Sequence, residues 1–313
     1  FEICSNKQSK YVLTSWFFIF NIISIDLIYE FTFGVNTLGF KSYMPGRLAG
    51  FLNEELKIGH LYSFFFLICA VTLFNKTKNV YLLYLFIFFS IFVSLLIGER
   101  SNFIRVFMMS VLFLFFFENK NYLKKIISII MITLLTFTFV ILNEDYQKRF
   151  YGQFIGPIVK LKNIDDVMNN TVYGANFDRA IKIFQSNKLF GVGIKNFRVE
   201  SNNPKYSNDK LKFNDQAATT HPHQIHLEIL SETGLVGYIF FVAFILLTIF
   251  FGIINFRKTN NLYILSSILY FILSLIPVLP SGSFFTTFGA TLFWINYSFL
   301  TFEKNLTSKN KNL

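Results

Sequence analysis

Long apolar runs separated by polar connections dominate the chain. Eight of these runs reach or approach the length of about 20 residues that an α-helix needs to cross a bilayer. They lie at about residues 11–29, 58–74, 80–97, 103–117, 126–142, 233–254, 261–279 and 284–302. The stretch from 143 to 225 is polar instead, with prolines, asparagine runs and mixed charge. The pattern predicts an all-α integral membrane protein of about eight transmembrane helices, with a large loop domain between the fifth and the sixth.

Composition indicates the same class of protein. Hydrophobic residues make up 53% of the 313 residues and charged residues only 15%, whereas a soluble domain carries about 25% charged residues. The net charge of +11 does not indicate nucleic-acid binding, because much of it lies in short lysine pairs between apolar runs. Cys4 and Cys69 lie in a terminal segment and an apolar run, so neither a disulfide framework nor a zinc site is predicted.

The positions of lysine and arginine predict the orientation of the helices, because short cytoplasmic connections are enriched in both. With the amino terminus inside, the short outer loops 98–102 and 280–283 carry Arg100 alone. The inner side carries Lys7, Lys10, Lys76, Lys78, Lys120, Lys124, Lys125, Arg257, Lys258, Lys304, Lys309 and Lys311. The polar stretch is therefore predicted to be external, and periplasmic in a Gram-negative cell.

This orientation divides the chain into four parts. We predict a five-helix membrane region over 1–142 with an outer loop at 30–57, a large external domain over 143–225, a three-helix membrane region over 226–303 and a cytoplasmic tail over 304–313. The outer loop, the turn around Arg100 and the large domain all face outward, as a single outward-facing active site requires. The chain begins with Phe1 rather than Met, which is compatible with a truncated amino terminus.

Three of the four histidines cluster at the mouth of a hydrophobic segment, in the stretch HPHQIHLEILSETGLVG at 221–237. They are His221, His223 and His226. Titratable imidazoles cost free energy near a bilayer, so the cluster indicates a functional site. A metal site built from the three is the weaker alternative, because Pro222 constrains the first pair.

The stretch resembles the signature of the O-antigen ligase and polymerase superfamily. The matching residues are His223, Leu227, Leu230, Glu232, Gly234, Leu235 and Gly237, with Gln224 where Asn is usual. FGVGIKNF at 190–197 is similar to the superfamily's Gly-x-Gly-x-x-x-Phe turn. The resemblance runs from about residue 45 to 250.

The resemblance implies an inverting, metal-independent glycosyltransferase of the C type, without a cofactor, in the bacterial inner membrane. Such enzymes take glycan from an undecaprenyl-diphosphate carrier on the outer face of that membrane. His223 would be the general base on the acceptor hydroxyl, a task that suits a neutral imidazole. His221 would orient His223 or the acceptor, whereas His226 is expected to pack.

Four further residues are candidates for holding the donor or the sugars. Arg100, in the GERSN turn, would grip diphosphate oxygens in a bidentate fork, with Glu99 as its positioning partner. Arg47, in the outer loop, would line the glycan or diphosphate path. Arg179 lies closer to the glycine turn than the superfamily's diphosphate-binding arginine does. Each arginine also has an interpretation without function: Arg100 would snorkel to the interface, Arg47 would lie in an interfacial loop, and Arg179 would lie on a solvated helix face.

The glycines of the 190–197 turn have two interpretations. They would let backbone N–H groups approach phosphate, or they simply end an external amphipathic helix that carries Ile181, Ile183, Phe184 and Leu189.

The acceptor decides between two activities of the superfamily. A ligase transfers glycan to lipid A-core, a polymerase transfers it to another carrier-linked repeat, and some relatives transfer to protein. We favour the ligase. A transporter or flippase of lipid-linked sugars is the alternative from another class, but it requires intramembrane charges and an internal repeat. The helices carry little charge outside Asp26 and Arg105, and no repeat is visible.

Overall fold

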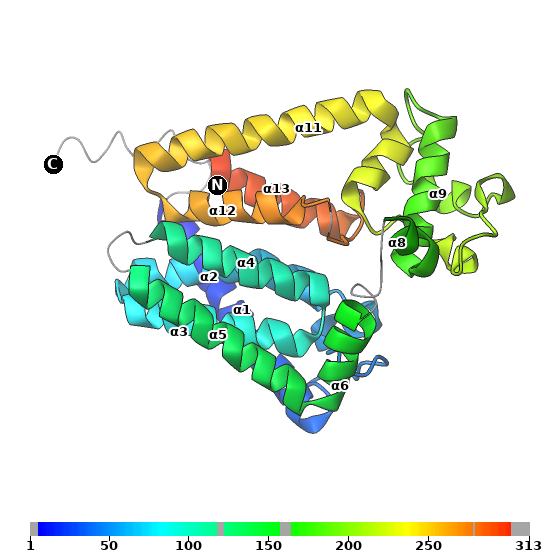
Figure 1. Ribbon diagram of the computed structural model, residues 1–313. Coiled ribbons are helices and arrows are strands. Elements are labelled where there is room, and N and C mark those ends of the chain that lie inside the picture. Colours follow the sequence, from blue (N-terminus) through cyan, green and yellow to red (C-terminus); the bar gives the residue numbers. More distant parts are fainter. Residues whose placement is uncertain (1–5, 118–121, 157–163, 278, 302–313) are drawn as a thin grey trace. The chain divides into compact units, whose positions relative to one another are not determined.

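The computed structural model describes residues 6–117, 122–156, 164–277 and 279–301 (Figure 1). All regular secondary structure in these ranges is helical. Cys4, Lys120, Pro157 and the predicted tail 304–313 lie outside the described residues.

Six helices are long and apolar enough to cross a membrane. They are α1 (Asn6–Phe33), α2 (Ile58–Thr77), α3 (Val80–Ile97), α4 (Arg100–Phe117), α5 (Tyr122–Leu142) and α11 (Ile225–Thr259). Each coincides with a predicted run. The last two runs correspond to α12 (Leu262–Ser274) and α13 (Thr287–Thr301), which have 13 and 15 residues. A multi-pass helical membrane protein is thus confirmed, whereas the count of eight spans stays a prediction.

The chain forms two compact units. Unit 1 comprises Phe1–Phe154, Phe251–Leu273 and Asn296–Leu313, and unit 2 comprises Ile155–Phe250 and Ser274–Ile295. The limits of these units differ from the predicted boundaries at 142 and 226, because those boundaries describe membrane topology rather than compactness. Both the predicted boundaries and the orientation of the helices stay predictions.

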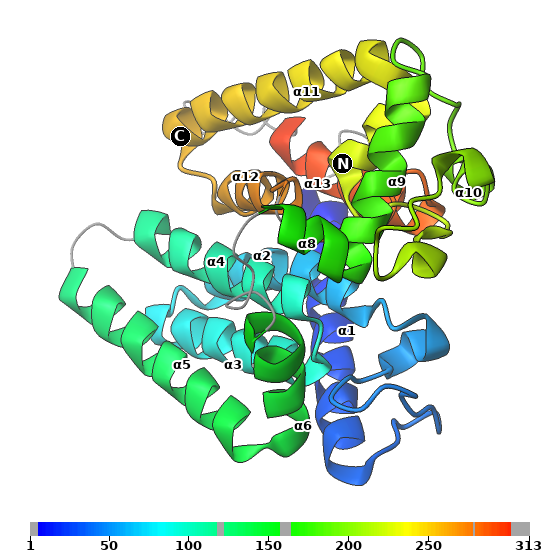
Figure 2. The ribbon, with the colours of Figure 1, turned by 45° about the vertical axis from the view of Figure 1, so that its right-hand side comes forward.

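Helix α2 is the most buried span of unit 1 and packs against α1, α3 and α4 (Figure 2). Tyr62 and Phe66, both on α2, are completely buried. The side chain of Asn79 caps α3 by accepting the backbone N–H groups of Tyr81 and Leu82, which satisfies two donors that the first turn leaves open. The apolar side chains of this bundle thus fix α4, whose first residue is Arg100.

One end of unit 1 gathers three segments that are distant in the sequence. The carboxylate of Glu30 accepts the N–H groups of Ala49 at 2.7 Å and Gly50 at 2.8 Å, which anchors the outer loop to α1. The N–H of Leu48 donates to the carbonyl of Ile97 at 3.2 Å.

The third segment consists of α6 (Glu144–Tyr146) and a π-helix over Gln147–Ile155. The hydroxyl of Tyr146 donates to the carbonyl of Leu96, and burial raises the pKa of this phenol well above its usual range. The outer loop, the turn after α3 and the start of the polar stretch therefore meet, as the predicted orientation requires.

Unit 2 is built around α9 (Val172–Ser186), with α8 (Ile164–Asn170), α10 (Phe197–Glu200) and the start of α11. The side chain of Thr171 caps α9 by accepting the N–H of Gly174 at 2.9 Å. Ile183 is completely buried in a cluster with Ala180, Phe197 and Tyr206, as its place on the predicted apolar face requires. Leu189 lies beyond the helix and is exposed, contrary to expectation.

Candidate active site

The histidine stretch forms a tight turn that leads into α11. His223 adopts a left-handed backbone conformation, with φ of 55°, which is uncommon for a residue other than glycine. Its carbonyl accepts the N–H of Ser281 at 2.9 Å. Gln224 caps α11: its Oε1 accepts the N–H of Leu227 at 2.7 Å, and its Nε2 donates to the carbonyl of Pro277 at 3.1 Å. Gln224 thus supplies the helix-capping oxygen that an Asn would offer at this position.

The ring of His223 has two aromatic neighbours. Its centroid is 4.3 Å from that of His221 and 6.0 Å from that of Tyr173, which meets it edge-on. Within the described part of the chain, no group hydrogen bonds to the His223 ring. Burial lowers the pKa of His223 from its ordinary value of 6.5. The imidazole is therefore neutral at pH 7, and it can accept a proton.

The other two histidines have defined partners. Nδ1 of His221 lies 3.0 Å from the hydroxyl of Thr220. Nε2 of His226 lies 2.7 Å from the carbonyl of Leu275, and its Nδ1 lies 3.2 Å from the hydroxyl of Tyr238. A carbonyl only accepts, so Nε2 of His226 carries the proton and Nδ1 accepts from Tyr238. Both nitrogens of His226 are thus engaged, which agrees with a packing role and keeps this residue out of a three-histidine metal site.

Arg179 is buried rather than solvated. Its Nη1 donates to the carbonyl of Ser201, and its Nη2 donates to Oδ1 of Asn214 at 2.9 Å. Burial lowers the pKa of this guanidinium. The solvated-face interpretation is therefore wrong, and these contacts tie α9 to the loop that precedes the histidine turn.

The two stretches that carry the resemblance pack directly on each other. The N–H of Val192 donates to the carbonyl of Ser231 at 3.0 Å, and the N–H of Gly193 donates to the carbonyl of Glu232 at 2.8 Å. The carboxylate of Glu232 turns back into the glycine turn. Its two oxygens accept the N–H of Lys195 at 2.6 Å and the N–H of Phe197 at 3.1 Å.

Glycine is required on both sides of this contact. Gly191 and Gly234 have φ of 65° and 68°, and a Cβ atom on either would overlap the backbone of the opposite segment. The anion held by the turn is therefore the Glu232 carboxylate. The phosphate-cradle interpretation fails for these N–H groups, because they already donate to Ser231 and Glu232.

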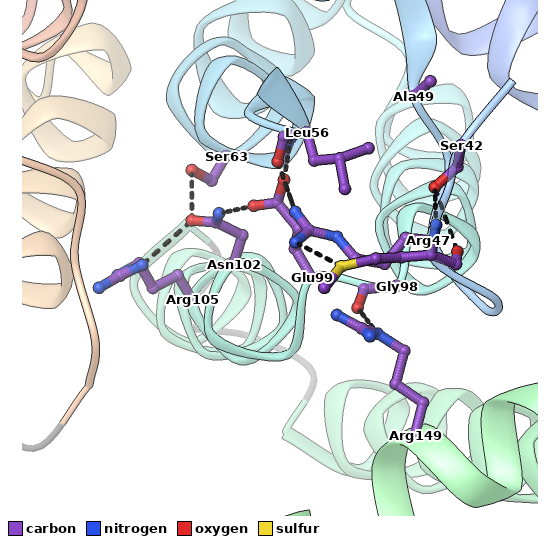
Figure 3. A network of polar contacts seen from close by, with 12 residues as sticks. Ser42, Arg47, Ala49, Leu56, Ser63, Gly98, Glu99, Asn102, Arg105 and Arg149 are labelled. Atoms are coloured by element: carbon purple, nitrogen blue, oxygen red, sulfur yellow. Dashed lines mark hydrogen bonds and ion pairs between the residues drawn. The ribbon is translucent and has the colours of Figure 1, made fainter. Parts of the chain in front are cut away.

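Unit 1 holds a separate polar network at the first turn of α4 (Figure 3). The carboxylate of Glu99 forms an ion pair with Arg47 at 2.8 Å, and it also accepts the side-chain amide of Asn102. Arg47 donates in addition to the carbonyl of Leu56. Glu99 is thus paired with Arg47, and its expected role as the positioning partner of Arg100 stays a prediction.

Asn102 extends this network into the bundle (Figure 3). Its Oδ1 accepts from Nη1 of Arg105 at 3.1 Å and lies 3.5 Å from the hydroxyl of Ser63. Nε of Arg105 donates to the carbonyl of Leu273 at 3.3 Å. The intramembrane charge of Arg105 therefore has partners within unit 1.

Arg100 itself is half-buried at the first turn of α4. Its Nη1 donates to the carbonyl of Gln153 at 2.9 Å. Nε of the buried Arg149 donates to the carbonyl of Gly98 in the same turn. The 98–100 turn and the π-helix over Gln147–Ile155 are thus joined by two guanidinium groups, those of Arg100 and Arg149.

A family model described as O-antigen ligase matches residues 64–242, which is more than half of the chain. The chain belongs to the O-antigen ligase family. Membership implies a glycosyltransferase-type enzyme of the ligase or polymerase kind, as the histidine and glycine motifs predicted. No curated protein matches the chain.

The O-antigen ligase match covers Arg100, Glu99, Arg179, His221 and His223, and Arg47 lies before it. Arg47, Glu99 and Arg100 belong to unit 1, whereas Arg179, His221 and His223 belong to unit 2.

Three neighbours of the candidate residues escaped the sequence interpretation. The contact of Asn102 with Glu99 could have been predicted from the sequence, because residues three positions apart lie on the same face of a helix. The contacts of Tyr173 and Arg149 could not have been predicted in this way, because they join segments about 50 residues apart.

Proposed function

We propose that this protein is an inverting glycosyltransferase that moves glycan from undecaprenyl diphosphate to an acceptor hydroxyl. The observation that carries the proposal is the ring of His223. It is half-buried, it has a pKa lowered by burial, and it has no hydrogen-bond partner among the described residues. A group of this kind is suited to accept a proton from a bound hydroxyl at neutral pH.

In the proposed reaction, the acceptor oxygen attacks the anomeric carbon and its proton passes to His223. The bond from that carbon to the carrier diphosphate breaks, and undecaprenyl diphosphate leaves with the electron pair. His221, whose ring contacts that of His223, orients the base. Tyr173 keeps one side of the imidazole from water.

The departing diphosphate requires fixed positive charge. Arg100 is the first candidate for this charge, because it lies at the start of α4, where the helix dipole also favours an anion. Arg47 is the second candidate, with Glu99 as its positioning partner rather than a sugar ligand. The backbone contacts of Arg179 favour a structural role for that residue.

The acceptor is the open part of this proposal. We favour lipid A-core, which makes the protein a ligase, and a carrier-linked repeat would make it a polymerase. Purified protein in vesicles, given undecaprenyl-diphosphate glycan together with each acceptor separately, distinguishes the two. Glycosylated lipid A-core supports the ligase, and a lengthened carrier-linked chain supports the polymerase. Failure to transfer to either acceptor contradicts the proposed function.

The site is proposed to face the periplasm from the inner membrane. Cysteines introduced at Asn169 and Asn260, both exposed, test this orientation. An impermeant thiol reagent should label the first in intact cells and the second only after lysis. Labelling of the second alone would reverse the orientation.

A further inference from the structure

The glycine turn presents apolar side chains to its surroundings. In the segment from Lys188 to Lys195, the exposed fractions of Leu189, Phe190 and Ile194 are 61%, 73% and 60%. Three large apolar side chains exposed in one short turn mark a surface that something covers.

Hydrogen bonds fix this turn to one level of α11. The N–H of Leu235 donates to the carbonyl of Lys188 at 2.8 Å, and the N–H of Val236 donates to the carbonyl of Leu189 at 3.2 Å. At Gly191 the turn also lies so close to the backbone of Glu232 and Thr233 that a Cβ atom would overlap it. The turn therefore cannot move along the helix without losing these bonds.

That level of α11 coincides with the edge of its membrane-spanning part. Between Glu232 and Arg257 the helix contains no charged residue. About 20 residues, at a rise of 1.5 Å each, cross a hydrocarbon core of about 30 Å. Counted back from Arg257, the other edge of the core falls at about residue 236, next to the bonds from Lys188 and Leu189. One turn further along, Phe240 is 72% exposed, as a lipid-facing side chain is.

Charge at the turn fits the headgroup layer. Lys188 and Lys195 are exposed and bracket the three apolar residues. Basic side chains at this depth reach lipid phosphates while their stems stay in the apolar layer. Continuity with the lipid-facing surface of α11 and this charge pattern both favour lipid as the occupant.

We infer that Leu189, Phe190 and Ile194 insert into the phospholipid leaflet beside α11, with Lys188 and Lys195 on the headgroup phosphates. The turn would then be a membrane-surface anchor for the part of unit 2 that precedes α11. This inference does not depend on the proposed reaction, because it uses only the position of the turn along α11.

Fluorescence quenching in vesicles tests the anchor. In the full chain carrying Cys4→Ser, an environment-sensitive dye is attached at Phe190→Cys, Phe240→Cys or Lys210→Cys. The native Cys69 is buried, so it does not react while the protein is folded. The protein is reconstituted in phosphatidylcholine and phosphatidylglycerol. Phe240→Cys gives the membrane reference, and the exposed position Lys210→Cys gives the aqueous one.

The anchor predicts that lipid carrying a doxyl group near the headgroup quenches the dye at position 190, as it does at 240. Aqueous iodide should quench only the dye at 210. Iodide quenching at 190 equal to that at 210 would overturn the inference. Protection at 190 from both quenchers would also overturn it, because protein rather than lipid would then cover the turn. Leu189→Cys provides a second position if the first variant does not fold.

Discussion

Replacement of Glu232 by Gln perturbs the contact between the two family motifs with the smallest change in shape. In the native protein the carboxylate accepts two backbone N–H groups, those of Lys195 and Phe197, and its side chain is almost completely buried. A glutamine amide has only one oxygen. One of the two N–H groups must therefore face an NH₂ group, and the other loses a charged acceptor.

The cost follows from these two bonds. An unsatisfied buried N–H costs about 1–3 kcal/mol, and the change from a charged to a neutral acceptor costs about 1 kcal/mol more. Opening of the turn should thus become easier by about 2–4 kcal/mol, which corresponds to roughly 30- to 1,000-fold in its equilibrium constant.

Hydrogen exchange by mass spectrometry measures this opening directly. Peptides covering 188–200 should exchange faster by that factor in Glu232→Gln, and peptides from α3 should not change. Glu200→Gln is the matched control, because Glu200 lies in the same unit and its bond to Asn203 is exposed and 3.4 Å long. If Glu232→Gln lost glycan transfer while exchange over 188–200 stayed native, Glu232 would act on the reaction itself and this reasoning would fail.

Two further predictions concern the candidate residues. Burial lowers the pKa of His223 below 6.5, so kcat/KM should stay high as pH falls to 6.5 and decline only below it. Tyr173→Ala, which admits water to the ring, should move this decline to higher pH, whereas Tyr173→Phe should not. Identical pH profiles for the native protein and both variants would refute the burial argument. Arg100→Lys should lose most of the transfer activity despite keeping the charge, because a lysine cannot form the planar fork. Arg105→Lys, at a buried position that bonds to the backbone of α12, should instead lower thermal stability with a smaller loss of activity, and equal activity in both variants would reduce Arg100 to a structural cation.

The positions of the membrane helices were predictable because the bilayer imposes long apolar runs. The start of α11 was not. The apolar run was predicted to begin at 233, and α11 does break at Gly234, where the backbone is not helical. A helical segment that was not predicted precedes this break; it begins at Ile225, is capped by Gln224 and carries His226 and Glu228. A hydropathy pattern does not detect a polar, buried helix start of this kind.

The candidate site was predictable as a set of residues and not as a set of contacts. The motif located His223, but its neighbour Tyr173 comes from a helix 50 positions earlier. Glu99 was assigned to Arg100 because the two are adjacent in the sequence, whereas the loop anchored by Glu30 brings Arg47 to it. Such long-range pairs depend on tertiary packing, which leaves no periodic trace in a single sequence.

Glycan transfer by His223→Ala tests the central claim most directly. With purified undecaprenyl-diphosphate glycan and the acceptor that supports turnover, this variant should lose roughly 10²–10⁴-fold in kcat, the usual contribution of a general base. It should remain folded, with native exchange over 188–200. His226→Ala is the matched control at a histidine whose two nitrogens are already engaged, and it should retain substantial activity. Native activity in His223→Ala, or an equal loss in His226→Ala, would contradict the assignment of His223 as the base.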